Sequence, residues 1–480
     1  MIRRLSGFAG QNVKEGAKLG KLSINPDGSS KKKITLFSIL FMGLSHILFL
    51  KQVGKGILFA LIELVFLFFT VITTIFFPNG YSIIYSITDM FTWGVENGVV
   101  VNSEPHNFIL IQGVMTVVVV LLFIVAYVIS VTSARSAYKD FCISGGRFEA
   151  KQSAGRVIDN AFPMYALAPA LILVLFFVIV PLIFSFMVAF TDYTGITQDS
   201  FSWVGWDNFI TMFGGDAQWT SALVRVVVWT LIWAVLATVT CYGGGLIVAV
   251  LLTDRKIKLA PIFRTIFILP YAVPSIVSMR VWYSLLNGST GIINRTLEVI
   301  GFNDFLRNIN LIGGADSFFG TDMMPWMSDV TLAKIVCIVI NLWAGFPYFM
   351  LLSMGTMTSI SADVNEAARI DGANSFQIFR KITLPLVLYQ TAPLVIMSLV
   401  HNINNFGAIF YLTGGMPTAE DSATTFAYGT DIIVTWIYNL TVTQTKYMYA
   451  SVLAILVFIV LCPVAIWNFR RTKSFKEGEV

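Results

Sequence analysis

The chain has 480 residues, of which 56% are hydrophobic and only 12% are charged, and its mean hydropathy is +0.76. Soluble domains carry about 25% charged residues, so this composition excludes a soluble domain and predicts an all-α polytopic membrane protein. The net charge of +5 is explained by Lys and Arg in cytoplasmic loops, and we assign it no nucleic-acid partner.

Four cysteines are widely scattered and show no CxxC spacing: Cys142, Cys241, Cys337 and Cys462. This pattern excludes a disulfide framework and argues against a structural metal site. We expect the cysteines to be packing residues, and we expect neither a metal nor a cofactor.

The first predicted domain, 1–56, combines a basic tail with a short apolar segment. Residues 1–33 are polar, lack the apolar core of a signal peptide and are expected to form a flexible cytoplasmic tail. Residues 34–50 are apolar, but a helix of that length reaches only about 25 Å, short of a hydrocarbon core of about 30 Å. We predict an interfacial or re-entrant helix there, and not a full span.

Eight longer apolar segments are predicted to cross the membrane as helices. The first two are accessory spans and form, with a linker containing Gly145, Gly146 and Gly155, a domain over 57–160. The other six form a core over 161–469, followed by a cytoplasmic tail, 470–480. The predicted spans are 57–77, 108–131, 162–190, 222–252, 264–287, 331–356, 386–413 and 447–469.

The distribution of basic residues predicts the orientation of these spans. Most of the 32 Lys and Arg residues fall before the first span and after every second one, whereas 78–107 and 191–221 carry none. Cytoplasmic loops are rich in Lys and Arg, so we expect both termini in the cytoplasm. A further span at 34–50 would place Lys31–Lys33 outside, which is a second reason to reject it.

The longest polar interruption of the C-terminal half, 361–385, has the signals of two short helices that meet at a glycine. Asp363 is predicted to N-cap the first helix, with Glu366 three residues later as in a capping box, and Asp371-Gly372 to end it. A second helix is expected from about Ser375, with one face formed by Phe376, Phe379 and Ile382. These signals predict a docking element, although from these residues alone an ordinary capped loop is the simpler interpretation.

Polar side chains within the spans are a second signal, because the bilayer penalises them and they tend to face a cavity. One predicted span contains Ser398, Asn402, Asn404 and Asn405, and Asn402 and Asn405 are three residues apart on one face. Amides offer donors and acceptors without charge, which suits a neutral, hydroxyl-rich ligand. Hydrogen bonds between helices are an equally good explanation.

The docking element resembles a known motif. Glu366-Ala367-Ala368, then Gly372, then Ile382-x-Leu384-Pro385 are similar to the EAA signature of permease subunits of prokaryotic binding-protein-dependent ABC importers. The resemblance covers about 160–470 and looks closest to the larger, MalF-type permease subunit of maltose-type carbohydrate transporters. The loop 191–221 is too short for the large periplasmic domain of some maltose permeases, and the outer turn Thr413–Pro417 has Met416 between its glycines and its proline.

The resemblance implies two groups of site residues. Contact with a separate ATP-binding subunit is implied for the coupling residues Glu366, Ala367, Ala368, Asp371 and Gly372. In maltose-type permeases the matching segments line the sugar path, which implies substrate contacts at Tyr271, Asn341, Gly345, Tyr348, Ser398, Asn402 and Asn405. The run Gly345-Phe346-Pro347 is expected to interrupt its helix where backbone faces a cavity.

The resemblance also implies a setting: a multi-pass subunit in a prokaryotic plasma or inner membrane that imports a maltodextrin-like oligosaccharide. Implied partners are a second homologous permease, a dimer of ABC ATPase subunits, an extracytoplasmic sugar-binding protein and membrane lipid. The chain has no GxxxxGK[ST] sequence, so we assign ATP hydrolysis to another chain and expect no catalytic residue and no enzyme here.

Two alternatives stay open. A permease of this kind can instead carry a different glycoside or a polyol. An ion-coupled secondary transporter would need several carboxylates or histidines within its spans, and the first span holds Glu63 with no basic partner in the same span.

Overall fold

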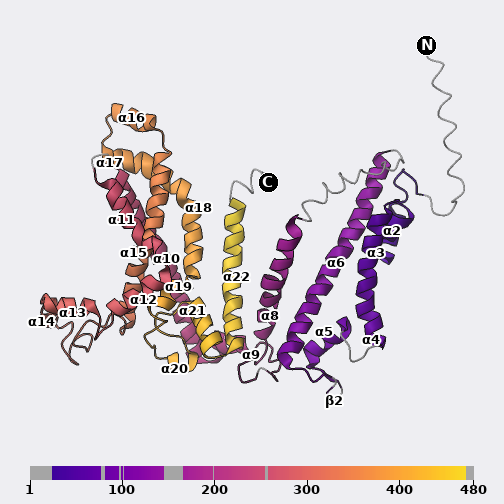
Figure 1. Cartoon of the computed structure of the whole chain (residues 1–480), viewed down its shortest axis with the longest axis horizontal. Helices are drawn as coiled ribbons and strands as arrows, with labels where there is room; N and C mark the ends of the chain where they lie inside the picture. The colour runs from indigo at the N-terminus through magenta and orange to yellow at the C-terminus, as the bar shows by residue number, and fades with distance from the viewer. Residues whose placement is uncertain are drawn as a thin grey trace, which may run out of the picture. The chain divides into compact units, whose positions relative to one another are not determined.

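The computed structural model describes residues 24–76, 82–96, 99–100, 102–144, 166–197, 199–253 and 258–471. Most of the predicted tails (1–33 and 470–480) and the predicted glycine linker lie outside these residues. The chain divides into two compact units, described separately here and drawn in Figure 1: unit 1 is Met1–Ser185 with Gln198–Ser202, and unit 2 is Phe186–Thr197 with Trp203–Val480. The strands of the described ranges are a two-residue antiparallel pair, β1 (Val95–Glu96) and β2 (Val99–Val100). The predicted all-α fold is therefore confirmed.

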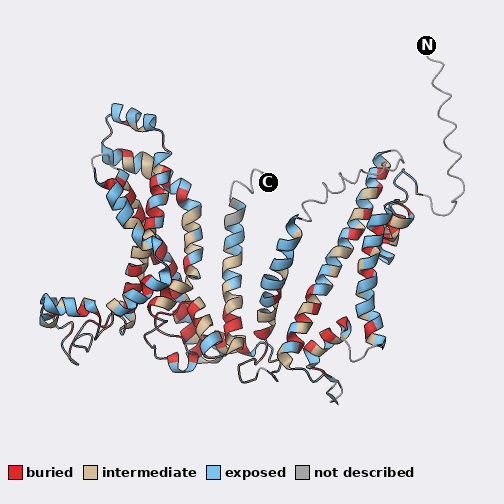
Figure 2. Cartoon of the chain, in the orientation of Figure 1, coloured by how far each residue is buried: buried red, intermediate tan, exposed pale blue. Residues whose placement is uncertain are grey.

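Unit 1 is built around α3 (Val53–Leu67) and α6 (His106–Ile143). α3 continues through the π-helical turn η1 (Phe68–Ile72) into α4 (Thr73–Phe76), and α5 (Ile83–Thr92) packs on α6. A third long helix, Ala166–Val188, includes η2 (Leu175–Ile179) and α8 (Val180–Val188) and belongs to unit 1 up to Ser185. Many apolar side chains of these helices are exposed (Figure 2), as expected for helices that face lipid.

The segment 34–50 forms two short helices and not the single helix predicted: α1 (Lys31–Leu40) and α2 (Leu44–Leu48). Gly43 lies between them with a φ of 79°, and a Cβ there would lie 2.1 Å from the carbonyl oxygen of Gly56. Glu63 of α3, 7% exposed, accepts a hydrogen bond from the backbone N–H of Met42 at this break. The carboxylate therefore satisfies backbone that the broken helix leaves free.

Unit 2 is organised around α10 (Ala217–Thr253), which packs along α15 (Val330–Thr358) and against α18 (Leu384–Ile403). Gly245 allows α10 and α15 to touch, since a Cβ on it would lie 2.6 Å from the backbone nitrogen of Met350. Further elements are α9 (Asp207–Ile210), η3 (Thr211–Gly215), α13 (Ile292–Val299), α14 (Phe302–Asn308), α19 (Phe406–Leu412), α20 (Ser422–Thr425), α21 (Ile433–Tyr438), η5 (Asn439–Thr443) and α22 (Tyr447–Arg471).

Seven helices in the described residues are long and apolar enough to cross a membrane, and an eighth span results if α11 (Ala260–Ala272) and α12 (Ser275–Leu285) are taken together. These two helices are bent by 92° at the break between them, where Pro274 lacks the N–H that would continue a helix and disfavours helical backbone before it. The span predicted over 264–287 therefore falls on a bent pair of helices and not on one continuous helix. The other predicted spans fall on the seven helices and differ at their ends.

Two predictions of helix shape are wrong. The run Gly345-Phe346-Pro347 does not interrupt a helix, because α15 continues through Pro347. The helix predicted over 386–413 ends at Ile403, and Asn405 N-caps a new helix, α19, by accepting from the backbone N–H of Ala408 at 3.3 Å. Asn side chains compete for backbone hydrogen bonds and so favour such breaks.

Candidate functional site

One end of unit 2 is formed by α16 (Ala362–Ile370) and α17 (Ser375–Ile378), at the top of Figure 1. Ser361, and not Asp363, N-caps α16: its hydroxyl accepts from the backbone N–H of Asp363 at 3.3 Å. The predicted cap is thus two residues too late, because both residue types can cap a helix. Asp363 instead lies in the first turn, where the helix dipole favours a carboxylate.

Gly372 joins these two helices in a backbone conformation that favours glycine. Its φ is 83°, and nothing lies within 4 Å of a Cβ built on it. Asp371 ends α16, with its N–H donating to the carbonyl oxygen of Ala367 at 3.0 Å. Asn374 and Gln377 form a capping box at the start of α17, with hydrogen bonds of 2.8 and 2.9 Å. The predicted arrangement of two helices meeting at a glycine is confirmed.

The surface of this element combines exposed apolar and charged residues. Ile370 is 86% exposed and Phe376 is 66% exposed. Ala368 is buried, while exposed neighbours are Glu366, Ala367 and Asp371. Of the three residues predicted to share a face, Phe376 is exposed on α17. Phe379 and Ile382 are half-buried in the π-helical segment η4 (Phe379–Thr383), whose turns differ from those of an α-helix. Exposed apolar side chains rimmed by charges mark an interaction surface.

Tyr271 and Tyr348 come together from α11 and α15. Their ring centroids are 6.3 Å apart and the rings are tilted by 32°. Tyr271 is 56% exposed and Tyr348 is 38% exposed. Part of each ring is therefore accessible from outside unit 2. Each tyrosine also has a hydroxyl that can hydrogen-bond.

Asn341 and Gly345 both face Cys241 of α10. Nδ2 of Asn341 lies 3.4 Å from the Cys241 sulfur, and a Cβ on Gly345 would lie 2.8 Å from the same atom. Glycine at 345 therefore permits the close approach of α10 and α15.

Asn402 and Asn405 lie at the end of α18, and Nδ2 of Asn405 donates to Oδ1 of Asn402 at 3.2 Å. Asn402 is only 5% exposed, and its Nδ2 donates to the hydroxyl of Thr238 in α10 at 3.0 Å. Hydrogen bonding between helices, one of the two explanations open for these amides, therefore describes Asn402 in this structure. Ser398, one turn earlier on α18, is half-buried.

The substrate residues predicted from the sequence thus meet as pairs within unit 2: Tyr271 with Tyr348, Asn341 with Gly345 across Cys241, and Asn402 with Asn405. Among the residues that the structure describes, no three His, Cys, Asp or Glu side chains are placed to hold a metal ion.

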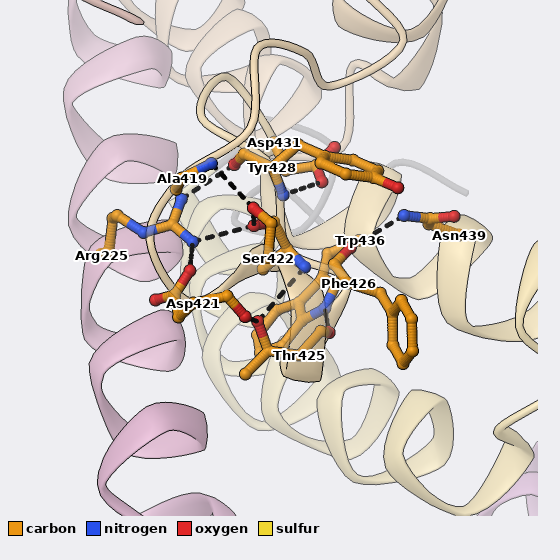
Figure 3. Close-up of polar contacts among 11 residues, drawn as sticks. Arg225, Ala419, Asp421, Ser422, Thr425, Phe426, Tyr428, Asp431, Trp436 and Asn439 are labelled. Carbon is orange, nitrogen blue, oxygen red and sulfur yellow. Dashed lines mark hydrogen bonds and ion pairs between the residues drawn. The ribbon is translucent and has the colours of Figure 1, made fainter.

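One polar cluster has no counterpart among the residues predicted from the sequence. In it, Arg225 of α10 contacts the loop between α19 and α21 (Figure 3). The signal for it lies in the spacing of Arg225, Trp229 and Trp233, which fall on one face of a largely apolar helix.

The part of unit 2 that holds most of these residues matches a family model. Residues 242–471 match the model described as binding-protein-dependent transport system inner membrane component. The galactooligosaccharides transport system permease protein GanP of Bacillus subtilis is 33% identical over 401 residues, which cover 83% of this chain and 91% of GanP. This chain belongs to that permease family. The resemblance at the EAA-like motif is confirmed, and the permease is a multi-pass membrane protein.

Other relatives are similar to this chain in sequence, and one solved structure is similar to it in fold. The maltodextrin transport system permease protein MalC of Streptococcus pneumoniae is 30% identical over 95% of this permease and 99% of MalC. The maltose/maltodextrin permease MalF of Escherichia coli is 33% identical over 56% of this permease and 49% of MalF. A chain of a bacterial alginate ABC transporter, solved with an alginate pentasaccharide-bound periplasmic protein, is 21% identical and matches 68% of this permease and 99% of its own length with a TM-score of 0.50. That likeness supports the fold.

Membership in this family implies that the chain is one of several proteins that make up a transporter. The permease is a transporter subunit, and it works with another permease, an ATPase and a substrate-binding protein.

Proposed function

We propose that this permease forms the path of an ATP-driven importer of neutral oligosaccharides, with a maltodextrin-like substrate. One observation carries the proposal: the maltodextrin permease MalC aligns at 30% identity over 95% of this chain and 99% of its own length. The residues proposed to meet the solute carry no charge, which suits a neutral, hydroxyl-rich ligand better than an anion.

We assign direct solute contact to the more exposed of these residues. The rings of Tyr271 and Tyr348 offer flat faces for sugar rings, and Ser398 and Asn405 add polar groups that are only half-buried. The other three members of the set act by fixing α15 and α18 on α10, through the contacts with Cys241 and Thr238: Asn341, Gly345 and Asn402.

Energy coupling is assigned to α16 and α17. The exposed side chains of Ile370 and Phe376 supply apolar contact area for a partner, and exposed carboxylates flank them. The proposed contacts to a separate dimer of ATPase subunits, which hydrolyses the ATP, are Glu366, Ala367, Ala368, Asp371 and Gly372.

This assignment sets the topology of the importer. α16, α17 and both chain termini lie in the cytoplasm of a prokaryotic cell, and the loop between α19 and α21 lies outside. The complete importer contains a second homologous permease and an extracytoplasmic sugar-binding protein, in a lipid bilayer. The proposed domains are the tail and short helices at 1–56, the accessory spans at 57–160, the core at 161–469 with its coupling element at 361–385, and the tail at 470–480.

The similarity to GanP favours a second candidate substrate, a galactooligosaccharide. GanP, which is named for galactooligosaccharides, is 33% identical to this permease. Both candidates are neutral oligosaccharides, so the same aromatic and amide contacts suit either of them.

Competition for uptake by cells that express the complete importer tests the proposal. We expect unlabelled maltodextrin or galactooligosaccharide to compete with labelled maltodextrin, and an anionic alginate oligosaccharide not to compete. Tyr271→Ala and Tyr348→Ala should each lower uptake about tenfold, the effect of a contact of about 1.4 kcal/mol, whereas the Phe variants, which keep the ring, should lose less. Competition by the anionic oligosaccharide alone would contradict the assignment.

A further inference from the structure

The loop that follows α19 is folded back on itself. We call residues 413–432 the cap. The hydroxyls of Thr413 and Thr430 lie 2.8 Å apart at its base, and the N–H of Thr430 donates to the carbonyl oxygen of Gly415 at 2.8 Å. Figure 1 shows α20, which is part of the cap, at the end of unit 2 opposite α16. The cap therefore lies at the end of the unit away from the proposed ATPase contact.

One face of α10 carries side chains that hydrogen-bond to the cap, to the residue that follows it and to the end of α18. Trp229 Nε1 donates to the carbonyl oxygen of Thr430 at 3.0 Å, and Trp233 Nε1 donates to that of Asn402 at 3.1 Å. The hydroxyl of Thr230 accepts from the N–H of Ile433 at 3.0 Å. Because positions four apart share a face of a helix, a single edge of α10 binds both the cap and the end of α18.

Arg225 also lies on this face of α10, one turn before Trp229 and nearer the start of the helix. Its Nη1 donates to the carbonyl oxygen of Tyr428 at 2.8 Å, its Nη2 donates to that of Ala427 at 2.9 Å, and Nη2 also pairs with the carboxylate of Asp421 (Figure 3). The Asp421 side chain is only 10% exposed. Charged hydrogen bonds in a partly buried setting are stronger than neutral ones, and removing one partner leaves the others unpaired.

A native cysteine lies beneath the cap. Cys337 of α15 is 1% exposed. It belongs to one apolar cluster with Trp229, Leu412 and Ile432. Because Ile432 of the cap is part of this cluster, we expect movement of the cap away from α10 to make this sulfur more accessible.

We propose that Arg225 is a positioning residue of the transport path: it keeps the cap closed on α10, on the same helix that fixes Asn402, so that this end of the path is sealed in the conformation described. This inference rests on the proposed function only in taking the helices beneath the cap as part of the solute path and the cap as lying outside the membrane. Loss of the three contacts of Arg225 shifts the equilibrium toward an open cap, because they exist only in the closed state.

The test measures labelling of Cys337 by a charged, water-soluble maleimide in the complete importer in membranes, with the labelled peptide quantified by mass spectrometry. We expect Arg225→Ala to raise the labelling rate about tenfold or more, the effect of one charged hydrogen bond of about 1.5 kcal/mol. Arg225→Lys keeps the charge but cannot reach three acceptors together, so its rate should be intermediate. Arg307→Ala is the matched control, because Arg307 forms an exposed ion pair with Glu298 elsewhere in unit 2.

A second cysteine separates opening of the cap from general loosening. Cys241, 4% exposed, lies at the crossing of α10 and α15, where its sulfur is 3.4 Å from the carbonyl oxygen of Asn341. Faster labelling at Cys337 without a matching rise at Cys241 supports the positioning role, whereas an equal rise at both, or no rise at either, overturns it. Asp421→Asn, which keeps the size of the side chain and removes its charge, provides the same test if Arg225→Ala does not reach the membrane. The labelling needs neither sugar nor ATP, so a wrong substrate assignment would leave its result unchanged.

Discussion

At the scale of single residues, Asp431 is a carboxyl group buried inside the cap. Burial raises its pKa from 3.8 to about 6, although the Tyr428 N–H and the Thr435 hydroxyl both donate to it and act in the opposite direction, as does the nearby Arg225. The folded protein therefore holds this proton more tightly than the unfolded chain. The contribution of the protonated group to stability is complete below pH 3.8 and is lost as the pH rises through about 6.

This shift predicts a pH dependence of stability. Between about pH 4 and pH 7 the free energy of unfolding should fall by about 2.4 kcal/mol on account of this group. Asp431→Asn cannot ionise and should lack that part of the slope. Thermal midpoints of the two purified proteins, measured over this range, check the prediction, and parallel profiles would contradict it.

A second prediction at this scale comes from two glycines of α10 that differ in how closely other residues pack against them. A Cβ on Gly245 would lie 2.6 Å from the backbone nitrogen of Met350, whereas a Cβ on Gly243 would meet nothing within 4 Å. Gly245→Ala should push α10 and α15 apart and cost about 1–3 kcal/mol. Gly243→Ala, with the better helix propensity of alanine, should be neutral or stabilise by up to about 1 kcal/mol. Thermal unfolding of both variants measures the difference, and equal effects would show that the crossing is not tightly packed.

At the scale of elements, the proposed coupling role of α16 and α17 predicts that two substitutions there will reduce transport. Gly372→Asp adds a charged side chain at an exposed junction whose positive φ favours glycine, and Glu366→Lys reverses an exposed charge. Both variants should insert into the membrane at normal levels and lose at least about 90% of uptake, a loss equivalent to about 1.4 kcal/mol. Uptake and membrane content are measured together.

The control for this prediction is Gly301→Asp. Gly301 has a φ of 75° and no atom within 4 Å of a Cβ, so its backbone cost matches that at Gly372. It precedes α14, outside the coupling element. Normal uptake by Gly372→Asp and Glu366→Lys would end the assignment of this element to coupling.

Hydropathy and capping residues predict these elements well where the signal is local. The long helices fall where apolar segments are long enough to cross the bilayer. The turn after α16 is predicted correctly because it depends on the local backbone, where Gly372 adopts a positive φ. The errors have non-local or ambiguous causes. Ser361 and Asp363 can both cap, so the sequence does not choose between them. The partners of Asn402 and Arg225 lie far along the chain, at Thr238 and Asp421, and only the fold brings them together.

At the scale of the whole molecule, the described residues place three kinds of contact on unit 2. α16 and α17 form one end, the cap lies at the other, and the tyrosine and asparagine pairs belong to the helices between. A solute path that opens alternately to the two sides needs a site that closes at each end and an element that receives the energy of ATP. In the proposed function, these three kinds of contact make unit 2 one half of such a path, and the second permease supplies the other half.

The central claim is that this chain is the path-forming subunit of an ATP-driven oligosaccharide importer. The most direct test is uptake of labelled maltodextrin by proteoliposomes that contain both permeases and the ATPase dimer, with the sugar-binding protein added. We predict uptake that requires ATP, persists when ion gradients are dissipated, and is lost with Gly372→Asp. Uptake that continues without ATP hydrolysis but collapses with the ion gradient would contradict the account.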